Sequence, residues 1–165
     1  MTGCKLRLPQ LEAYQARIER PIIAPEAESL AWRLEYKDYV AKVYPVTTTY
    51  GTQFISYAKD SLHFDGFIIR KIDRLGADIS RWTYSDTTET PTVVTRTLAK
   101  VLSENDSYRC TKRAVQNQYV LQVCKSVDSS SDYIFALEFD SNGELWKIYQ
   151  TLDSTGEQLI LTKLR

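Results

Sequence analysis

Histidine and aspartate side chains near predicted turns are the residues of this sequence best suited to acid–base chemistry. They are His63, which is the only histidine, and Asp60, Asp65, Asp73 and Asp78. A general base needs an orienting partner, and no serine, cysteine or aspartate near His63 forms a recognisable nucleophile signature. Two aspartates could supply the carboxylate pair of a glycosidase, but turns favour aspartate for their own hydrogen bonds. The sequence therefore favours a protein that is not an enzyme.

Two of the three cysteines are spaced for a disulfide across a hairpin. Cys110 and Cys124 lie equally far from Asn117, so a hairpin folded about residues 116–118 places them opposite each other, within the reach of a disulfide. This bridge closes a loop of about 15 residues and indicates an oxidising compartment. The alternative is two buried free thiols in a cytosolic protein. Histidine and cysteine do not show the spacing of a zinc site, and we expect no metal and no cofactor.

The third cysteine, Cys4, directly follows Thr2 and Gly3. A small residue, a glycine and a cysteine end a bacterial lipoprotein signal, and the cysteine then becomes the lipidated first residue of the mature protein. The sequence lacks the signal peptide itself, and it has no apolar run near the roughly 20 residues of a membrane-spanning helix. We therefore predict a lipid anchor at Cys4, with a chance occurrence of these residues as the alternative.

Charge and aromatic content narrow the choice of partners. The 165 residues include 21 basic and 21 acidic side chains, so no net field attracts nucleic acid, and we expect no nucleic-acid partner. Arg70 and Arg74 belong to a small basic cluster, while Trp82 and Trp146 are aromatic side chains able to stack on sugar rings. These four residues are candidate contacts to an envelope protein or a polysaccharide. A solvated strand face and ordinary core packing are the alternatives.

Turn residues at regular intervals predict a chain of β-hairpins. Residues 132–163 show three strand patterns separated by two turns, and Asp65-Gly66 predicts another hairpin turn. Residues 30–44 are interpreted as a hairpin, with a single helix as the alternative. We expect a helical turn or loop at residues 77–82 and a surface loop at residues 85–92.

This pattern predicts a mainly β fold. We expect an antiparallel β-sandwich or open barrel built from hairpins, with at most one or two short helices, one of them between Pro9 and Pro21. Residues 1–25 are interpreted as an N-terminal tether, and residues 26–165 as a single β-rich domain large enough to bury a substantial core.

Three stretches of the sequence carry a family resemblance. They are Gly3-Cys4, residues 65–79 with a turn and strand followed by a Leu-Gly corner, and residues 137–150 with a hairpin of aromatic strands. Together they resemble the GfcB/YjbF-like lipoproteins, which are lipid-anchored periplasmic proteins encoded with bacterial group 4 capsule and exopolysaccharide operons. The middle strand departs from the family at Ile69-Arg70, where a glycine–arginine pair is expected. The resemblance implies an outer-membrane lipoprotein accessory to polysaccharide secretion, with no catalytic residues to carry over.

The resulting hypothesis is a periplasmic protein held at the outer membrane by Cys4, which acts by contact with an envelope protein or a polysaccharide. Two alternatives remain open: a structural subunit of another envelope complex, such as a secretion apparatus, and a barrel that encloses a small molecule. A large apolar cavity would favour the carrier, whereas a filled core with an exposed strand edge or apolar patch would favour assembly.

Overall fold

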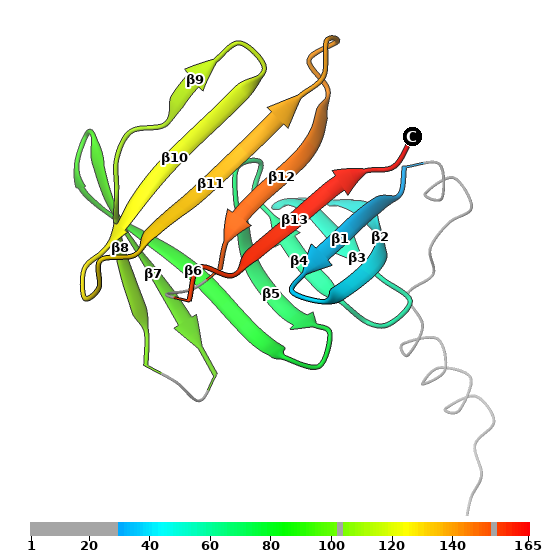
Figure 1. Cartoon of the computed structure of the whole chain (residues 1–165), viewed down its shortest axis with the longest axis horizontal. Helices are drawn as coiled ribbons and strands as arrows, with labels where there is room; N and C mark the ends of the chain where they lie inside the picture. The colour runs from blue at the N-terminus through cyan, green and yellow to red at the C-terminus, as the bar shows by residue number, and fades with distance from the viewer. Residues whose placement is uncertain (1–29, 102–103, 153–154) are drawn as a thin grey trace, which may run out of the picture.

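The computed structural model describes residues 30–101, 104–152 and 155–165, and this part of the chain contains strands and turns without a helix. The strands are β1 Trp32–Tyr36, β2 Tyr39–Thr48, β3 Gly51–Ile55, β4 Ser61–Phe64, β5 Ile69–Leu75, β6 Ile79–Thr90, β7 Val93–Lys100, β8 Asp106–Cys110, β9 Ala114–Gln116, β10 Tyr119–Ser126, β11 Asp132–Phe139, β12 Leu145–Thr151 and β13 Gln158–Lys163 (Figure 1). The predicted tether at residues 1–25, with its short helix and Cys4, lies outside the described residues. Among the described residues, no helix has the length and apolar character needed to span a membrane.

The strands form one antiparallel sheet that closes on itself. Strands β1 to β8 pair in sequence, β8 pairs with β10, and β10 to β13 then lead back to β1 through β11 and β12. The short strand β9 pairs with β10 alone, so the other twelve strands form the ring. The predicted mainly β, antiparallel fold is confirmed. Closure gives each strand of the ring two neighbours, which protects its backbone from pairing with other chains.

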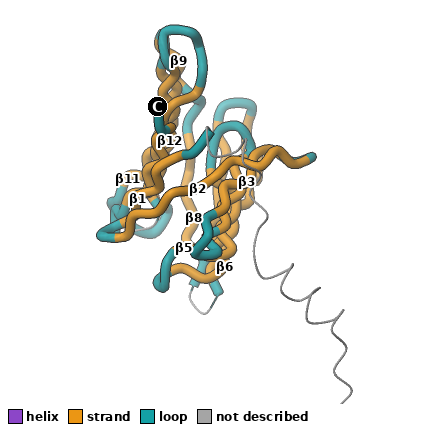
Figure 2. The backbone as a smooth tube through the Cα atoms, turned by 90° about the vertical axis from the view of Figure 1, so that its right-hand side faces the viewer, coloured by secondary structure: helices purple, strands orange, loops and turns teal. Residues whose placement is uncertain are grey.

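The ring is flattened into two layers, which Figure 2 shows edge-on. One layer contains β1 and β10 to β13, and the other contains β3 to β8, with the long strand β2 passing between them. Alternate side chains of each strand point between the layers, as the period of two in a strand requires. Leu34, Ile72 and Phe135 are among the fully buried members of the resulting core.

Polar side chains also cross the core and join the two layers. The side-chain amide of Gln150 in β12 accepts a hydrogen bond from the Ile69 N–H at 2.8 Å and donates to the Ile69 carbonyl at 3.2 Å. The Tyr84 hydroxyl in β6 donates to the carbonyl of Leu152 at 2.7 Å. Since buried polar groups need partners, these bonds fix how the layers sit on each other.

The polar run at residues 85–92 forms part of a strand, and the prediction of a surface loop was wrong. Strand β6 continues to Thr90 and pairs with β7 along its length, from Trp82 opposite Lys100 to Thr90 opposite Val93. Threonine is β-branched and suits an extended backbone even where both faces are exposed. Residues 77–82 were also predicted incorrectly, because β6 begins at Ile79 directly after a turn.

The hairpins predicted at residues 30–44 and at Asp65-Gly66 are both present, but the second has a longer turn than the two residues expected. β1 and β2 confirm the strand interpretation of residues 30–44, with Lys37 at a positive φ of 50° in the turn. Asp65-Gly66 lies in a longer connection, because Phe64 pairs with Ile69. The Asp65 carboxylate accepts hydrogen bonds from the N–H groups of Phe67 and Ile68, and both of these side chains are buried. Burial of two large apolar side chains explains why the turn is wider than two residues.

Candidate functional site

The disulfide expected from the cysteine spacing is present. Cys110 in β8 faces Cys124 in β10, the two sulfurs are bonded, and the Cα atoms are 4.0 Å apart. Beyond it the chain turns back at Asn117-Gln118, since Gln116 pairs with Tyr119 and Asn117 has a φ of 48°. Six steps separate Cys110 from Gln116, but only five separate Tyr119 from Cys124. The extra residue shifts the register, so β8 ends and β9 starts anew along the same edge of β10.

The tips of the β9–β10 and β11–β12 hairpins lie at the same end of the barrel (Figure 1), and a backbone hydrogen bond joins the two hairpins there. The N–H of Phe139, at the end of β11, donates to the carbonyl of Gln118 at 2.8 Å. In the β11–β12 turn, one carboxylate oxygen of Asp140 accepts from the N–H groups of Asn142 and Glu144 at 2.8 and 2.9 Å. These backbone hydrogen bonds, that from Glu144 first, lower the pKa of Asp140. Both tips are therefore held in defined conformations.

A surface hollow of about 460 Å³ lies between these two tips. We call it the tip hollow. Its lining consists of three amide side chains, three aromatic side chains and one carboxylate: Gln116, Asn117, Gln118, Tyr119, Phe139, Trp146 and Glu138. Its volume is within the range of small-molecule sites, but it is open to solvent and more polar than most of them.

Two of the lining residues belong to a row that crosses the outer face of the barrel. Tyr119 pairs with Glu138, and Glu138 pairs with Lys147. The Lys147 ammonium lies 3.8 Å from the Glu138 carboxylate and 5.8 Å from the centre of the Trp146 ring. Burial, followed by the nearby Glu138 charge, raises the pKa of Tyr119, so its hydroxyl keeps its proton and can donate a hydrogen bond. The row gives the hollow a phenol and a carboxylate, and the Lys147 ammonium lies beside that carboxylate.

Trp146 is the one predicted contact residue that lines the tip hollow; Arg70, Arg74 and Trp82 do not. Arg74 on β5 is exposed, and its guanidinium donates to the Gly76 carbonyl at 3.4 Å. Trp82 on β6 is half-buried beneath the Lys100 ammonium, which lies 5.1 Å from its ring centre. The structure therefore does not bring the four residues together into one site.

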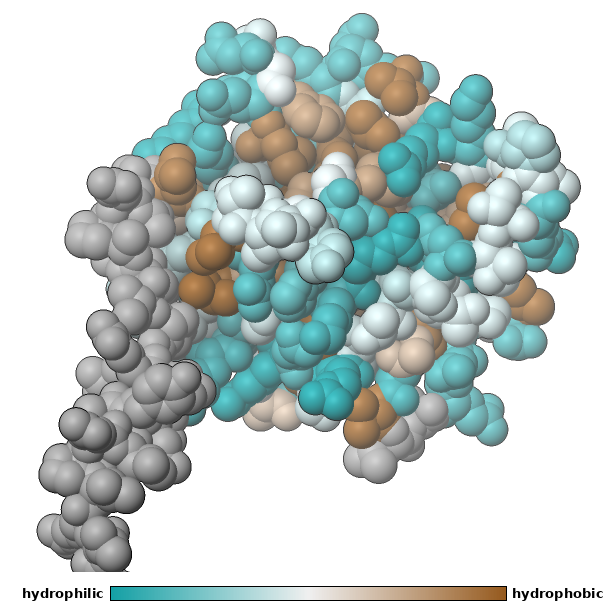
Figure 3. All heavy atoms as spheres, turned by 180° about the vertical axis from the view of Figure 1, so that it is seen from behind, coloured by the Kyte–Doolittle hydropathy of each residue, from teal (hydrophilic) through white to brown (hydrophobic). Residues whose placement is uncertain are grey.

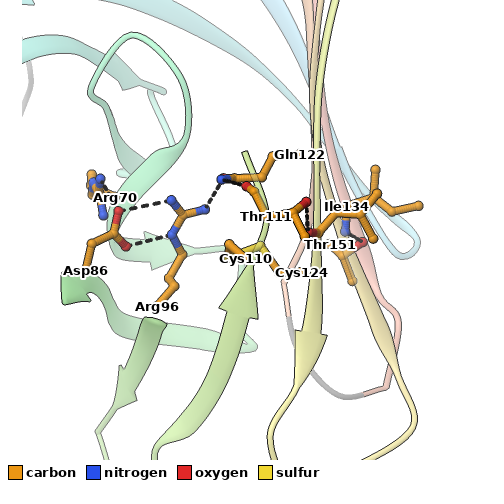
Figure 4. Close-up of a disulfide and its surroundings, with 10 residues drawn as sticks. Arg70, Asp86, Arg96, Cys110, Thr111, Gln122, Cys124, Ile134 and Thr151 are labelled. Carbon is orange, nitrogen blue, oxygen red and sulfur yellow. Dashed lines mark hydrogen bonds and ion pairs between the residues drawn. A yellow bond between two sulfur atoms is a disulfide. The ribbon is translucent and has the colours of Figure 1, made fainter. Parts of the chain in front are cut away.

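Arg70 belongs to a network of ion pairs that extends into the core. Its guanidinium donates to Asp65 at 2.6 Å and to Asp86 at 2.9 Å. Asp86 also accepts two hydrogen bonds from Arg96, whose side chain is 1% exposed and donates onward to Gln122 (Figure 4). Such a network occupies the guanidinium of Arg70 in structural contacts.

The network changes how Asp86 titrates. Burial alone would raise the pKa of Asp86, but the hydrogen bonds from Arg96 and Arg70 outweigh it and lower the pKa to about 2. Arg96 also lies over the ring of Phe135, with its guanidinium carbon 4.7 Å from the ring centre. A charged Asp86 at the edge of the core thus compensates the buried Arg96.

His63, Asp60 and Asp73, which were considered for catalysis, are used in separate local contacts. His63 lies 3.1 Å from Asp73, which also pairs with Lys71 at 2.6 Å. Asp60 is buried and accepts hydrogen bonds from Tyr39, Ser56 and the N–H of Gly76. Within residues 30–101, 104–152 and 155–165, no three histidine, cysteine or acidic side chains gather as metal ligands would.

Most of the tip hollow was not predicted from the sequence. Gln116, Asn117 and Gln118 were identified as a turn, and Tyr119, Glu138 and Phe139 as strand residues. A run of three amide side chains in an exposed turn was the available signal, because turns more often use glycine, proline, asparagine and aspartate. The approach of the two hairpin tips depends on the register between β10 and β11, which the sequence does not specify locally.

Comparison by sequence does not identify relatives of this chain: no protein-family model matches it, and no curated protein does. Comparison of folds identifies a similar architecture. The chain shares its closed antiparallel β architecture with a hypothetical lipoprotein, YmcC of Escherichia coli K12. The two structures superpose with a TM-score of 0.61 at 9% sequence identity, over all of this chain and 98% of that chain. At this identity the likeness establishes the fold.

Proposed function

We propose that this protein is a periplasmic lipoprotein, anchored to the outer membrane through Cys4, with a non-catalytic accessory role in the secretion of a surface polysaccharide. The observation that carries the proposal is the fold likeness, over nearly the whole of both chains, to a protein described as a hypothetical lipoprotein. The Thr2-Gly3-Cys4 sequence provides the matching acylation site, and the Cys110–Cys124 disulfide suits an oxidising compartment.

An accessory role through contact is supported by the filled interior and the exposed features of the outer surface. Large side chains such as Tyr108, Phe135 and Arg96 occupy the space between the layers, which weighs against a carrier that encloses a small molecule. Strand β9 has an unpaired edge within the described residues, and Val115 on it is 70% exposed. From behind, an apolar area interrupts a mainly hydrophilic surface (Figure 3). Exposed edges and apolar areas are typical of surfaces that bind partners.

The anchor is tested by expressing the protein from its native gene and extracting it from membranes. Mass spectrometry of the N-terminal peptide is expected to show acyl chains on Cys4, and more than one chain is needed for stable anchoring. The matched control is Cys4→Ser, which should be unmodified and leave the membrane fraction. Wild-type protein with an unmodified Cys4 in the soluble fraction would contradict the proposal.

The accessory role is tested by deleting the gene and measuring polysaccharide on the cell surface. We expect the amount to fall, to be restored by the wild-type gene, and to be restored poorly by Cys4→Ser, because anchoring raises the local concentration at the envelope machinery. Unchanged surface polysaccharide in the deletion strain would exclude this role and favour a subunit of another envelope complex, such as a secretion apparatus.

A further inference from the structure

We infer that the tip hollow binds an uncharged sugar unit of a glycan, with Trp146 as the platform for the ring. This inference rests on the proposed function, because it names the class of ligand that the accessory protein contacts. It is carried by the chemistry of the seven lining residues and by the charges around them.

The aromatic part of the lining suits the faces of a sugar ring. Trp146 and Phe139 are half-buried, and Tyr119 is 37% exposed, so each keeps accessible ring surface beside the hollow. The C–H face of a pyranose is apolar and has the dimensions of an aromatic ring, and aromatic side chains with one wet edge are the usual partners of such mixed surfaces. A purely apolar ligand would leave the neighbouring amides without partners, which is unfavourable.

The polar part of the lining suits hydroxyl groups. Gln116, Asn117 and Gln118 each have an amide that both donates and accepts hydrogen bonds, and all three are exposed. A sugar hydroxyl likewise both donates and accepts. The Tyr119 hydroxyl and the Glu138 carboxylate add a donor and an acceptor on the β10–β11 side. A ligand rich in hydroxyl groups can therefore satisfy every polar group of the hollow.

The charges around the hollow favour a neutral ligand. The one carboxylate in the lining, Glu138, is paired with Lys147 at 3.8 Å. In the adjoining turn, Glu144 is paired with Lys163 at 2.9 Å. A uronic acid would place its carboxylate near Glu138, and an amino sugar would compete with Lys147 for it. Since a like charge that is not compensated costs binding free energy, the site discriminates against charged sugars.

The walls of the hollow are fixed before any ligand arrives. The Phe139–Gln118 hydrogen bond joins the two tips, and the disulfide holds the base of the β9–β10 hairpin. Little conformational entropy is then lost on binding, which favours affinity for a weak ligand such as a single sugar unit.

Binding is tested with the purified full chain by NMR, from the indole N–H signals of Trp32, Trp82 and Trp146. The probes are hexamers of β-1,4-glucose, of α-1,4-glucose and of galacturonic acid, each titrated into the millimolar range. We expect a neutral hexamer to shift the Trp146 signal and to leave the Trp32 and Trp82 signals in place. Trp146→Ala, followed through the backbone amide signals of Gln118 and Phe139 because it lacks the Trp146 indole, should weaken this binding by about tenfold or more, which corresponds to roughly 1.4 kcal/mol. Trp82→Ala is the matched control and should bind as the wild type does.

Two further variants keep the test independent of any misfolding of Trp146→Ala. Asn117→Gly keeps the positive φ of the turn but removes an amide, and it should weaken neutral-sugar binding several-fold. Glu138→Gln should leave neutral-sugar binding within a few-fold and strengthen the binding of the galacturonic acid hexamer. Tighter binding of the acidic hexamer by the wild type, or no shift of Trp146 with either neutral hexamer, would overturn the inference. Acylation of Cys4 and the deletion phenotype are measured separately, so failure of sugar binding would leave the proposed function standing.

Discussion

The side chain of Gln150 acts as a missing strand neighbour for Ile69. Its amide accepts from the N–H and donates to the carbonyl of the same residue, at 2.8 and 3.2 Å, and joins positions 81 residues apart in the sequence. Gln150 is 1% exposed and Ile69 is fully buried. Ile69 is the first residue of β5, and its buried N–H and carbonyl thus both find hydrogen-bond partners in the opposite layer.

Replacing this amide is expected to destabilise the fold strongly. Gln150→Leu leaves the Ile69 N–H and carbonyl buried without partners, and each such group costs about 1–3 kcal/mol. We therefore predict a loss of about 2–4 kcal/mol in the free energy of unfolding, measured by urea denaturation. Gln53→Leu is the control, because the Gln53 amide donates to the Ser61 hydroxyl on a partly exposed strand. Equal losses in the free energy of unfolding for the two variants would show that the hydrogen bonds to Ile69 stabilise the fold no more than the partly exposed bond of Gln53 does.

Local patterns in the sequence were sufficient to predict several of the hairpins, but the closure of the ring required contacts between distant strands. Alternation and turn residues predicted the β1–β2 hairpin and the closing meander, because both depend on near neighbours. The pairing of β1 with β13, Trp32 opposite Lys163, depends on the whole circuit of strands. Gln150 fits an inward position by alternation, yet the sequence does not show which backbone it would meet. The tip hollow was missed for the same reason, since its walls come from two separate hairpins.

The ion pairs of Asp86 predict a loss of stability in acid. The pKa of Asp86 is about 2 in the folded protein against an ordinary value of 3.8, so the unfolded chain binds the proton more tightly. Its contribution of about 2 kcal/mol is complete above roughly pH 5 and is lost as the pH falls through 3.8 and then through the folded pKa of about 2. Urea denaturation at a series of pH values measures this dependence.

The Asp86→Asn variant isolates this contribution. At neutral pH it should be less stable than the wild type by at least about 2 kcal/mol, because Arg96 keeps its charge but loses its partner in the core. The difference between the two proteins should shrink as the pH falls and be smallest below about pH 2, where most of the wild-type carboxylate is also protonated. The lowered pKa of Asp73, which lies outside this network, is present in both proteins and cancels in the comparison. A difference that stays constant with pH would contradict this assignment.

The disulfide is expected to stabilise the fold and to hold the β9–β10 hairpin. Cys110 and Cys124 are 14 positions apart, and closure of a loop of about 15 residues is worth roughly 3 kcal/mol. The double variant Cys110→Ala/Cys124→Ala should lose about this amount in urea denaturation. Hydrogen exchange at the Tyr119 amide should accelerate more than at Leu34 in β1, since the bridge lies at the base of the hairpin. Unchanged exchange at Tyr119 would show that backbone pairing alone fixes the tip.

Gly51 and Gly143 both have positive φ angles, 127° and 79°, but only Gly51 is enclosed. A Cβ atom at Gly51 would lie 2.1 Å from the backbone carbonyl oxygen of Phe64 in the paired strand, whereas one at Gly143 would meet nothing within 4 Å. Gly143→Ala should therefore cost only the left-handed backbone strain, about 1 kcal/mol. Gly51→Ala adds a clash with backbone that cannot move without breaking the β3–β4 ladder, and we predict a loss of about 3 kcal/mol or more. Thermal and urea denaturation of the two variants measure the difference. Equal losses would contradict the prediction, because they would mean that β3 and β4 separate at little cost. The two strands would then not constrain each other as the register between Thr52 and Phe64 requires.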